Sequence, residues 1–330
     1  MFDNVKDFAD SIARSLNEDP KKPENRTFIV QQITKNNNSI FTAVTFKDEN
    51  GSVGTTVPLI YCEDFYEQHK ADVSNGWVPE DISYLEAVNS IKNAIETHSN
   101  FKLPGFSTGD IENFDVIKDK IQPKLVNFEN NTEYLTDKPY KQVDDLAVMY
   151  RIVIGDEASI PINNSMLSNW GIDRDELDSI AYGNLGENEF SFKTMGETLG
   201  ELMVPGFTEM SEEDRKNIID SMFPDTGMYI VTNKAKSYGA INVTHAPFME
   251  RVRNQIGDFV IIPSSVHECI LIKKEMIDNA RGSLETMICE VNQNEVQSEE
   301  VLSTHPYEFD FETGTLITYD ENKELGEDLD

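Results

Sequence analysis

The residues best suited to chemistry form one short block, in which two serines stand just before an adjacent histidine and glutamate. Ser264 or Ser265 could supply a nucleophilic hydroxyl, and His267 could act as the general base that removes its proton. A carboxylate from elsewhere in the chain would orient the imidazole. A hydrolase that uses Ser264 or Ser265 with His267 is therefore one hypothesis for this sequence.

The residues around this block favour a structural role for the same histidine. Segment 266–272 is apolar apart from His267 and Glu268, and it has the length of a strand. Alternation along a strand directs these two side chains to opposite faces, so they cannot pair with each other. No Gly-x-Ser-x-Gly motif occurs, and Leu271 stands where a zinc site would need its second histidine. For His267, structural hydrogen bonding is the favoured role. Contact with a ligand or a partner comes second, and catalysis third.

A second candidate is the turn at 233–236, which carries two lysines in a strongly acidic chain. These lysines could hold an anionic group at the end of a sheet, although asparagine and lysine are also ordinary turn residues. No glycine-rich phosphate motif and no metal-ligand spacing occurs, so we expect neither a cofactor nor a metal. The candidate residues for binding a ligand or a partner are Asn233, Lys234, His267 and Glu268.

The charge of the chain narrows the class of partner. Its 330 residues include 60 acidic and 28 basic ones, which gives a formal net charge of −32. Such a charge disfavours direct binding to nucleic acids or to anionic lipid. The expected partner is therefore another protein or a small molecule. The same charge raises a third hypothesis, an acidic decoy that mimics DNA and occupies proteins that normally hold phosphates.

The cysteines and the N-terminus indicate the compartment. Three cysteines occur without a Cys-x-x-Cys motif, which argues against a disulfide framework. The N-terminus lacks the basic start and apolar core of a signal peptide, and no run approaches the roughly 18 apolar residues of a membrane span. We therefore expect a cytoplasmic protein with no membrane segment.

Hydrophobic periodicity predicts the elements that position these residues, beginning with region 1–105. Apolar residues recur at helical spacing over 2–16, and two β-rich runs at 27–33 and 40–46 flank an asparagine-rich turn. A third strand is predicted at 54–60, and two helices follow it. This region is expected to form a helix, a three-stranded sheet and two further helices.

The clearest pattern lies in region 227–319, where we predict a β-β-α-β-β unit. Its strands are MYIVT, AINV, DFVIIP and HECILIKK, and its helix runs from Thr244 as the N-cap to Gly257. A further helix and a hairpin complete this region. Region 106–226 is predicted to be a mixed helical and strand connection, and 320–330 an acidic tail. The predicted fold class is α+β, with antiparallel sheets and packed helices.

Three blocks of the sequence resemble a known family. VPLIYCEDFYE, YIVTNKAKSYGA and IIPSSVHECIL occur in this order within residues 46–319. They are similar to an uncharacterised domain-of-unknown-function family of anaerobic Gram-positive gut bacteria, whose genes are often found in mobile or conjugative elements. The resemblance implies an accessory role and brings no activity with it. Because no catalytic motif is present either, we expect a non-enzymatic binding or interaction protein.

Overall fold

The chain divides into two compact units, Met1–Phe114 and Asp115–Asp330. Both units combine helices with antiparallel strands, which confirms the predicted α+β class. Each unit has hydrophobic clusters of its own. The computed structural model describes residues 2–48, 57–99, 108–155, 158–186, 190–223, 225–277 and 283–320. The predicted acidic tail therefore lies almost entirely outside the described residues.

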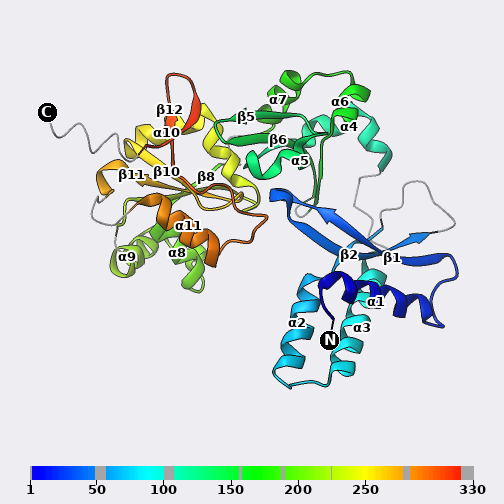
Figure 1. The fold of residues 1–330 in the computed structure, drawn as a ribbon. Coiled ribbons are helices and arrows are strands. Elements are labelled where there is room, and N and C mark those ends of the chain that lie inside the picture. The colour runs from blue at the N-terminus through cyan, green and yellow to red at the C-terminus, as the bar shows by residue number, and fades with distance from the viewer. Residues whose placement is uncertain are drawn as a thin grey trace. The chain divides into compact units, whose positions relative to one another are not determined.

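The N-terminal unit is a three-stranded antiparallel sheet with three helices on one side of it (Figure 1). Buried apolar residues of the first helix, among them Phe8 and Ile12, share one core with Ile91 and Ile95 of the third helix. The helical spacing read from the sequence is the cause, because it places these side chains on one face of each helix. The elements are α1 (Val5–Glu18), β1 (Arg26–Thr34), β2 (Ile40–Asp48), β3 (Ile60–Tyr61), α2 (Glu63–Ser74) and α3 (Glu80–Ser99).

Asparagines form the turn between β1 and β2, as predicted. Asn37 and Asn38 have φ angles of 58° and 52°, a left-handed conformation that asparagine tolerates better than most residues. The two strands then pair in a continuous antiparallel register. Of the predicted third strand at 54–60, residues 54–56 lie outside the described residues. Residues 57–59 are not in a strand, and β3 contains only Ile60 of the prediction and Tyr61 after it.

The C-terminal unit contains two sheets, and the smaller one is built around β6. Its strand order is β4-β6-β5, and β7 also pairs with β6. The sequence pattern misses β4, because Pro123 interrupts it. A proline is tolerated there since β4 is an edge strand with a free side. The elements are α4 (Phe114–Ile117), β4 (Ile121–Asn127), α5 (Thr132–Leu135), β5 (Tyr140–Val143), β6 (Leu146–Ile154), β7 (Ala158–Pro161), α6 (Asn164–Trp170) and α7 (Arg174–Gly183).

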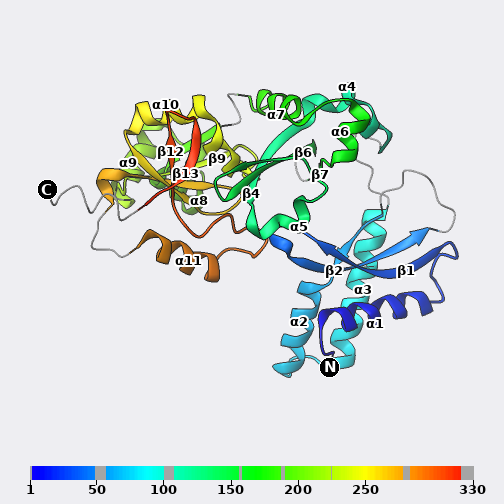
Figure 2. The same cartoon turned by 45° about the horizontal axis from the view of Figure 1, so that its top comes forward.

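The larger sheet has the strand order β13-β12-β10-β11-β9-β8, with every neighbouring pair antiparallel. Figure 1 shows α10 on one face of this sheet and α11 on the other, and the turned view in Figure 2 shows the same arrangement. Ile288 of α11 packs in a cluster with Val260 and Ile262 of β10. The elements are β8 (Phe190–Thr194), α8 (Met195–Met203), α9 (Glu212–Met222), β9 (Met228–Asn233), α10 (Ala246–Ile256), β10 (Phe259–Pro263), β11 (Cys269–Lys273), α11 (Leu284–Asn294), β12 (Tyr307–Asp310) and β13 (Thr315–Thr318).

One strand of the predicted β-β-α-β-β unit is wrong. Segment AINV lies in a 3-10 helix, η7 (Gly239–Thr244), in which the side chain of Asn242 donates to the carbonyl of Thr232 at 2.7 Å. This buried amide satisfies a backbone carbonyl of β9 itself, and β9 pairs with β8, a strand that the sequence pattern misses. The following helix begins one residue later than predicted, because His245 is its N-cap.

Two adjacent aspartates join the two sheets of the C-terminal unit. Asp144 and Asp145 lie between β5 and β6. Asp145 accepts a hydrogen bond from the Tyr307 hydroxyl at 2.6 Å and lies 3.0 Å from Nε2 of His305. Asp144 accepts from the backbone N–H of Thr318 at 2.6 Å. Because Tyr307 and Thr318 belong to β12 and β13, these contacts hold the smaller sheet to the C-terminal hairpin.

Candidate functional site

His267 and Glu268 lie in the turn between β10 and β11, whereas the sequence pattern places them on a strand. Neither of the two strands includes them. The backbone N–H of Ser265 donates to the carbonyl of Glu268 at 3.1 Å and closes the turn. Strand alternation therefore does not decide where the two side chains point. The carboxylate that meets the imidazole belongs to Glu300.

Both ring nitrogens of His267 have partners. The backbone N–H of Tyr238 donates to Nδ1 at 3.1 Å, and Nε2 lies 3.2 Å from Oε1 of Glu300. Since Nδ1 accepts a hydrogen bond, the neutral ring carries its proton on Nε2 and donates it to Glu300. The imidazole thus connects two loops, and it has no free nitrogen with which to take a proton from a serine.

The serines of the block serve the turn itself. The hydroxyl of Ser265 accepts a hydrogen bond from the backbone N–H of His267 at 3.0 Å. In the part of the chain that the structure describes, neither Ser264 nor Ser265 is hydrogen-bonded to the imidazole. The hydroxyl of Thr232 donates to the carbonyl of His267 at 2.8 Å and fixes the turn to β9. These contacts position a backbone, and they do not assemble a nucleophile with its base.

The turn at 233–238 is braced by its own hydrogen bonds. The side chain of Asn233 donates to the carbonyl of Ser237 at 2.8 Å and accepts from its N–H at 3.0 Å. The N–H of Lys236 donates to the carbonyl of Asn233 at 3.1 Å. Asn233 is thereby used inside the turn, while the side chains of Lys234 and Lys236 are exposed. The turn therefore presents two cations on a fixed backbone.

Gly239 allows this turn to meet the β10–β11 turn. A Cβ atom at this position would lie 2.4 Å from the backbone nitrogen of Asn233 and 2.5 Å from Oγ1 of Thr232. It would also lie 2.8 Å from the carbonyl oxygen of His267. Close backbone packing at Gly239 therefore requires glycine at the start of the 3-10 helix η7.

Gly239→Ala is expected to destabilise the C-terminal unit by about 1–3 kcal/mol, the usual cost of forcing a methyl group into a packed site. The added Cβ meets backbone atoms that cannot rotate away. Denaturant unfolding of the full chain measures the change. Gly183→Ala is the matched control, because a Cβ there meets nothing within 4 Å. Equal stability of the two variants would contradict the packing argument.

The aromatic ring of Tyr238 brings two further residues to His267. Tyr238 has a left-handed φ of 58°, and its ring centroid lies 5.2 Å from that of His267. The guanidinium carbon of Arg151 lies 4.4 Å from the Tyr238 ring, and Nζ of Lys124 lies 4.9 Å from it. We call Tyr238, His267, Glu300, Lys124 and Arg151 the Tyr238 cluster.

Lys124 and Arg151 are buried cations, and no carboxylate of the described residues pairs with either of them. They are 7% and 8% exposed, and neither forms an ion pair within the described residues. Burial, reinforced by the charges of Arg151 and Lys138, lowers the pKa of Lys124 to about 8, and burial also lowers that of Arg151. A contact with an aromatic ring contributes about 0.5–2 kcal/mol, whereas burying an ion costs several kcal/mol. The Tyr238 ring therefore offsets only part of this cost.

Sequence reasoning identified His267 but missed Lys124 and Arg151. Each is the only cation in an apolar strand, IQPKLVN for β4 and LAVMYRIVI for β6. Charged side chains are seldom buried unless they are paired. A single cation inside a run with the composition of a buried strand is the signal that could have revealed them.

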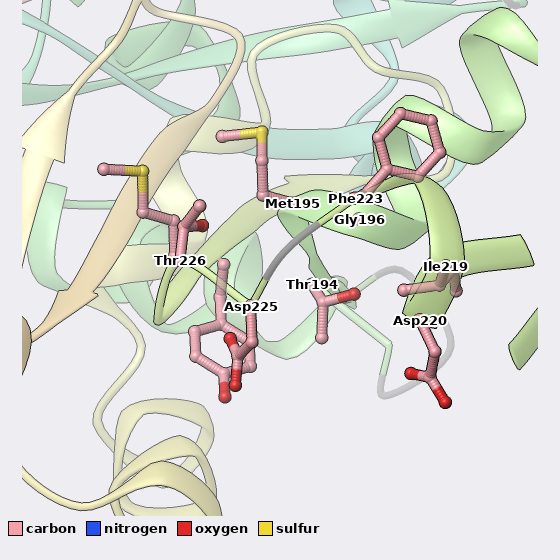
Figure 3. Close-up of a pocket in the computed structure, with 10 residues that line it drawn as sticks. Thr194, Met195, Gly196, Ile219, Asp220, Phe223, Asp225 and Thr226 are labelled. Atoms are coloured by element: carbon pink, nitrogen blue, oxygen red, sulfur yellow. The ribbon is translucent and has the colours of Figure 1, made fainter.

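A pocket of about 440 Å³ lies elsewhere in the C-terminal unit, beside α8 and α9 (Figure 3). Figure 3 shows Thr194 and Asp225 on one side of it and Met195 and Phe223 on the other. Thr194 caps α8 by accepting from the N–H of Glu197, and Asp225 accepts from a backbone N–H two residues later. Its polar groups thus stabilise local backbone, so the Tyr238 cluster is the stronger candidate site.

The protein is of the α+β class, and its Tyr238 cluster is a basic and aromatic site. The cluster brings Lys124 and Arg151, from strands of the smaller C-terminal sheet, to turns of the larger one. The chain belongs to DUF5688, a family of unknown function, whose model matches residues 5–311. No curated protein and no solved structure matches it. Among the helices within the described ranges, none is long and apolar enough to cross a membrane.

Proposed function

We propose that this chain is a non-enzymatic binding or interaction protein that contacts its partner through the turn at 233–238. The observation that supports this proposal is the exposure of Lys234 and Lys236 on a turn that is held by internal hydrogen bonds. A preorganised loop loses little conformational entropy when it binds. The partner is another protein or a small molecule, with a neutral or anionic surface where it meets the lysines.

A cytoplasmic location and a role in an accessory or mobile-element system belong to the same proposal. The resemblance of the sequence blocks to chains from Gram-positive anaerobes supports the second part. For the first part, Cys62 and Cys269 are buried free thiols, and burial raises the pKa of Cys62 to about 12. Unreactive thiols without disulfides are usual in a reducing compartment.

The proposal is tested by affinity capture with the full chain as bait, using extracts of the source cells. Lys234→Glu with Lys236→Glu is expected to reduce recovery of the bound partner by at least several-fold. Lys216→Glu makes a similar charge reversal at an exposed position on α9 and is expected to retain the partner. His267→Ala is expected to weaken binding less, because it removes the acceptor for the N–H of Tyr238 but leaves the lysines. Undiminished capture by the double variant would exclude the turn as the contact.

A hydrolase that uses Ser264 or Ser265 is the alternative, and we expect it to fail a direct chemical test. A fluorophosphonate probe labels serines that an adjacent base activates. We expect labelling of the wild-type chain to equal that of a Ser264→Ala, Ser265→Ala double variant, because both nitrogens of His267 are already engaged. Labelling that depends on His267 and on either serine, located by mass spectrometry, would establish the hydrolase instead.

A further inference from the structure

We propose that Lys124 and Arg151 form a binding site for a phosphate group. The site lies on the smaller C-terminal sheet and is separate from the lysines of the 233–238 turn. The inference rests on the proposed binding function, since it names a class of ligand for a protein of that kind. It does not require the turn to contact anything.

The strand register places the two cations together. Gln122 is paired with Arg151 and Lys124 with Met149 across β4 and β6. Residues 122 and 124 share one face of β4, and their partners share the same face of β6. Lys124 and Arg151 are therefore diagonal neighbours on one face of the sheet, which also carries the apolar cluster of Val126 and Ala147.

Two carboxylates of the surrounding described segments already have partners. Glu300 is paired with His267, and Asp137 is paired with Lys138 at 2.6 Å. The charges that act on the pKa of Lys124 are those of Arg151 and Lys138, both of them positive. Within the described residues the site therefore carries two adjacent positive charges with no counter-charge from the chain.

The donor groups that remain open fit an oxyanion. Nε of Arg151 is buried without a hydrogen-bond partner, and Nη2 has only a 3.3 Å contact with Oε1 of Gln122. The ammonium of Lys124 has ring faces around it, at 4.9 Å from Tyr238 and 5.9 Å from Tyr134. A guanidinium edge and an ammonium are the groups that proteins use for phosphate. A phosphate dianion neutralises both cations, whereas a single carboxylate leaves one charge uncompensated.

Tyr238 connects this site to the rest of the cluster. Its ring lies over both cations, and its N–H is held by His267. A phosphate group that reaches Lys124 displaces part of the contact between its ammonium and the Tyr238 ring. It replaces that contact with a stronger charge–charge contact. The site therefore adjoins the proposed partner-binding turn without sharing the lysines of that turn.

The test measures the thermal midpoint of the full chain in chloride buffer with added inorganic phosphate, O-phosphoserine or succinate at matched ionic strength. We expect both phosphates to raise the midpoint and succinate to leave it unchanged. Lys124→Met and Arg151→Met are expected to weaken phosphate binding at least tenfold, and Lys216→Met is expected to bind as the wild type does. A response to O-phosphoserine alone identifies a phosphorylated molecule as the source, and an equal response to inorganic phosphate identifies the free ion.

A second measurement needs no variant. The pKa of Lys124, followed by the ¹³Cε chemical shift, is expected to be about 8 in chloride and to rise when phosphate is added. No phosphate-specific effect in either measurement would overturn the site, and a stronger response to succinate would overturn the assignment to phosphate. The two proposals can fail separately. If the Lys234→Glu, Lys236→Glu double variant no longer captures the partner but still binds phosphate, the phosphate site is retained.

Discussion

Raising the pH from about 8 to about 10 in chloride buffer is expected to increase the free energy of unfolding by roughly 2 kcal/mol through Lys124 alone. In the folded chain, burial and the charges of Arg151 and Lys138 lower the pKa of Lys124 from 10.5 to about 8. In the unfolded chain the ammonium has its usual pKa, so the unfolded state binds more protons between the two values. The destabilisation caused by the charged Lys124 is therefore fully present below the pKa of the folded state. It disappears as the pH rises toward the pKa of the unfolded state.

Denaturant unfolding at a series of pH values measures this effect. Lys124→Met is expected to remove the rise and, near pH 7, to stabilise the chain by roughly 1–3 kcal/mol, because an apolar side chain of similar length replaces an unpaired buried charge. Lys216→Met, at an exposed position, is expected to keep the rise. Burial raises the pKa of Tyr134 to about 12, which places its titration above this window. Parallel curves for the wild type and Lys124→Met would contradict the assignment.

Asp145→Ala is expected to lower the free energy of unfolding by roughly 2–3 kcal/mol, the usual value of hydrogen bonds to a charged group. The substitution removes the charged acceptor for the Tyr307 hydroxyl, which leaves it only the Ser303 hydroxyl at 2.6 Å among its described partners, and it removes the partner of His305. Tyr307 is 1% exposed, so water cannot easily replace the lost acceptor. The change removes one of the two aspartates that hold the β5–β6 turn to the C-terminal hairpin, and the effect should exceed that of an ordinary surface substitution.

The control for Asp145→Ala is Asp175→Ala, which removes an exposed carboxylate paired with Arg174 and is expected to leave stability unchanged. Tyr307→Phe removes the hydrogen bond from the Tyr307 hydroxyl to Asp145 and leaves the contact of Asp145 with His305. In a double-mutant cycle, Asp145→Ala combined with Tyr307→Phe is expected to cost less than the sum of the single changes. Additive effects would show that the hydrogen bond between the two side chains contributes little.

The elements that the sequence predicts well are those whose pattern is local. The helical spacing of Phe8, Ile12 and Leu16 predicts α1, and the asparagines between β1 and β2 predict a turn with positive φ. Gly257 follows α10, at the helix end that the sequence marks. In each case the cause lies within a few residues, so the pattern needs no knowledge of the rest of the chain.

The elements that it misses depend on distant partners. β4 contains Pro123, which is acceptable only because the strand lies at the edge of its sheet. Segment AINV has the composition of a strand, yet Asn242 binds the carbonyl of Thr232 and β8 takes the place beside β9. A strand is stable only with a neighbour, and the sequence of the strand does not say which neighbour is available.

The sequence by itself determined the α+β class and the local helices and turns, and it singled out the block around His267 as a candidate site. Only the tertiary structure decided what that histidine faces. Its partners are the N–H of Tyr238 and the carboxylate of Glu300, which is 33 residues further along the chain. Lys124 and Arg151 join the same cluster from another sheet. Hydrogen bonding and burial depend on distances in space, and a pattern along one chain does not contain the distances between its remote parts.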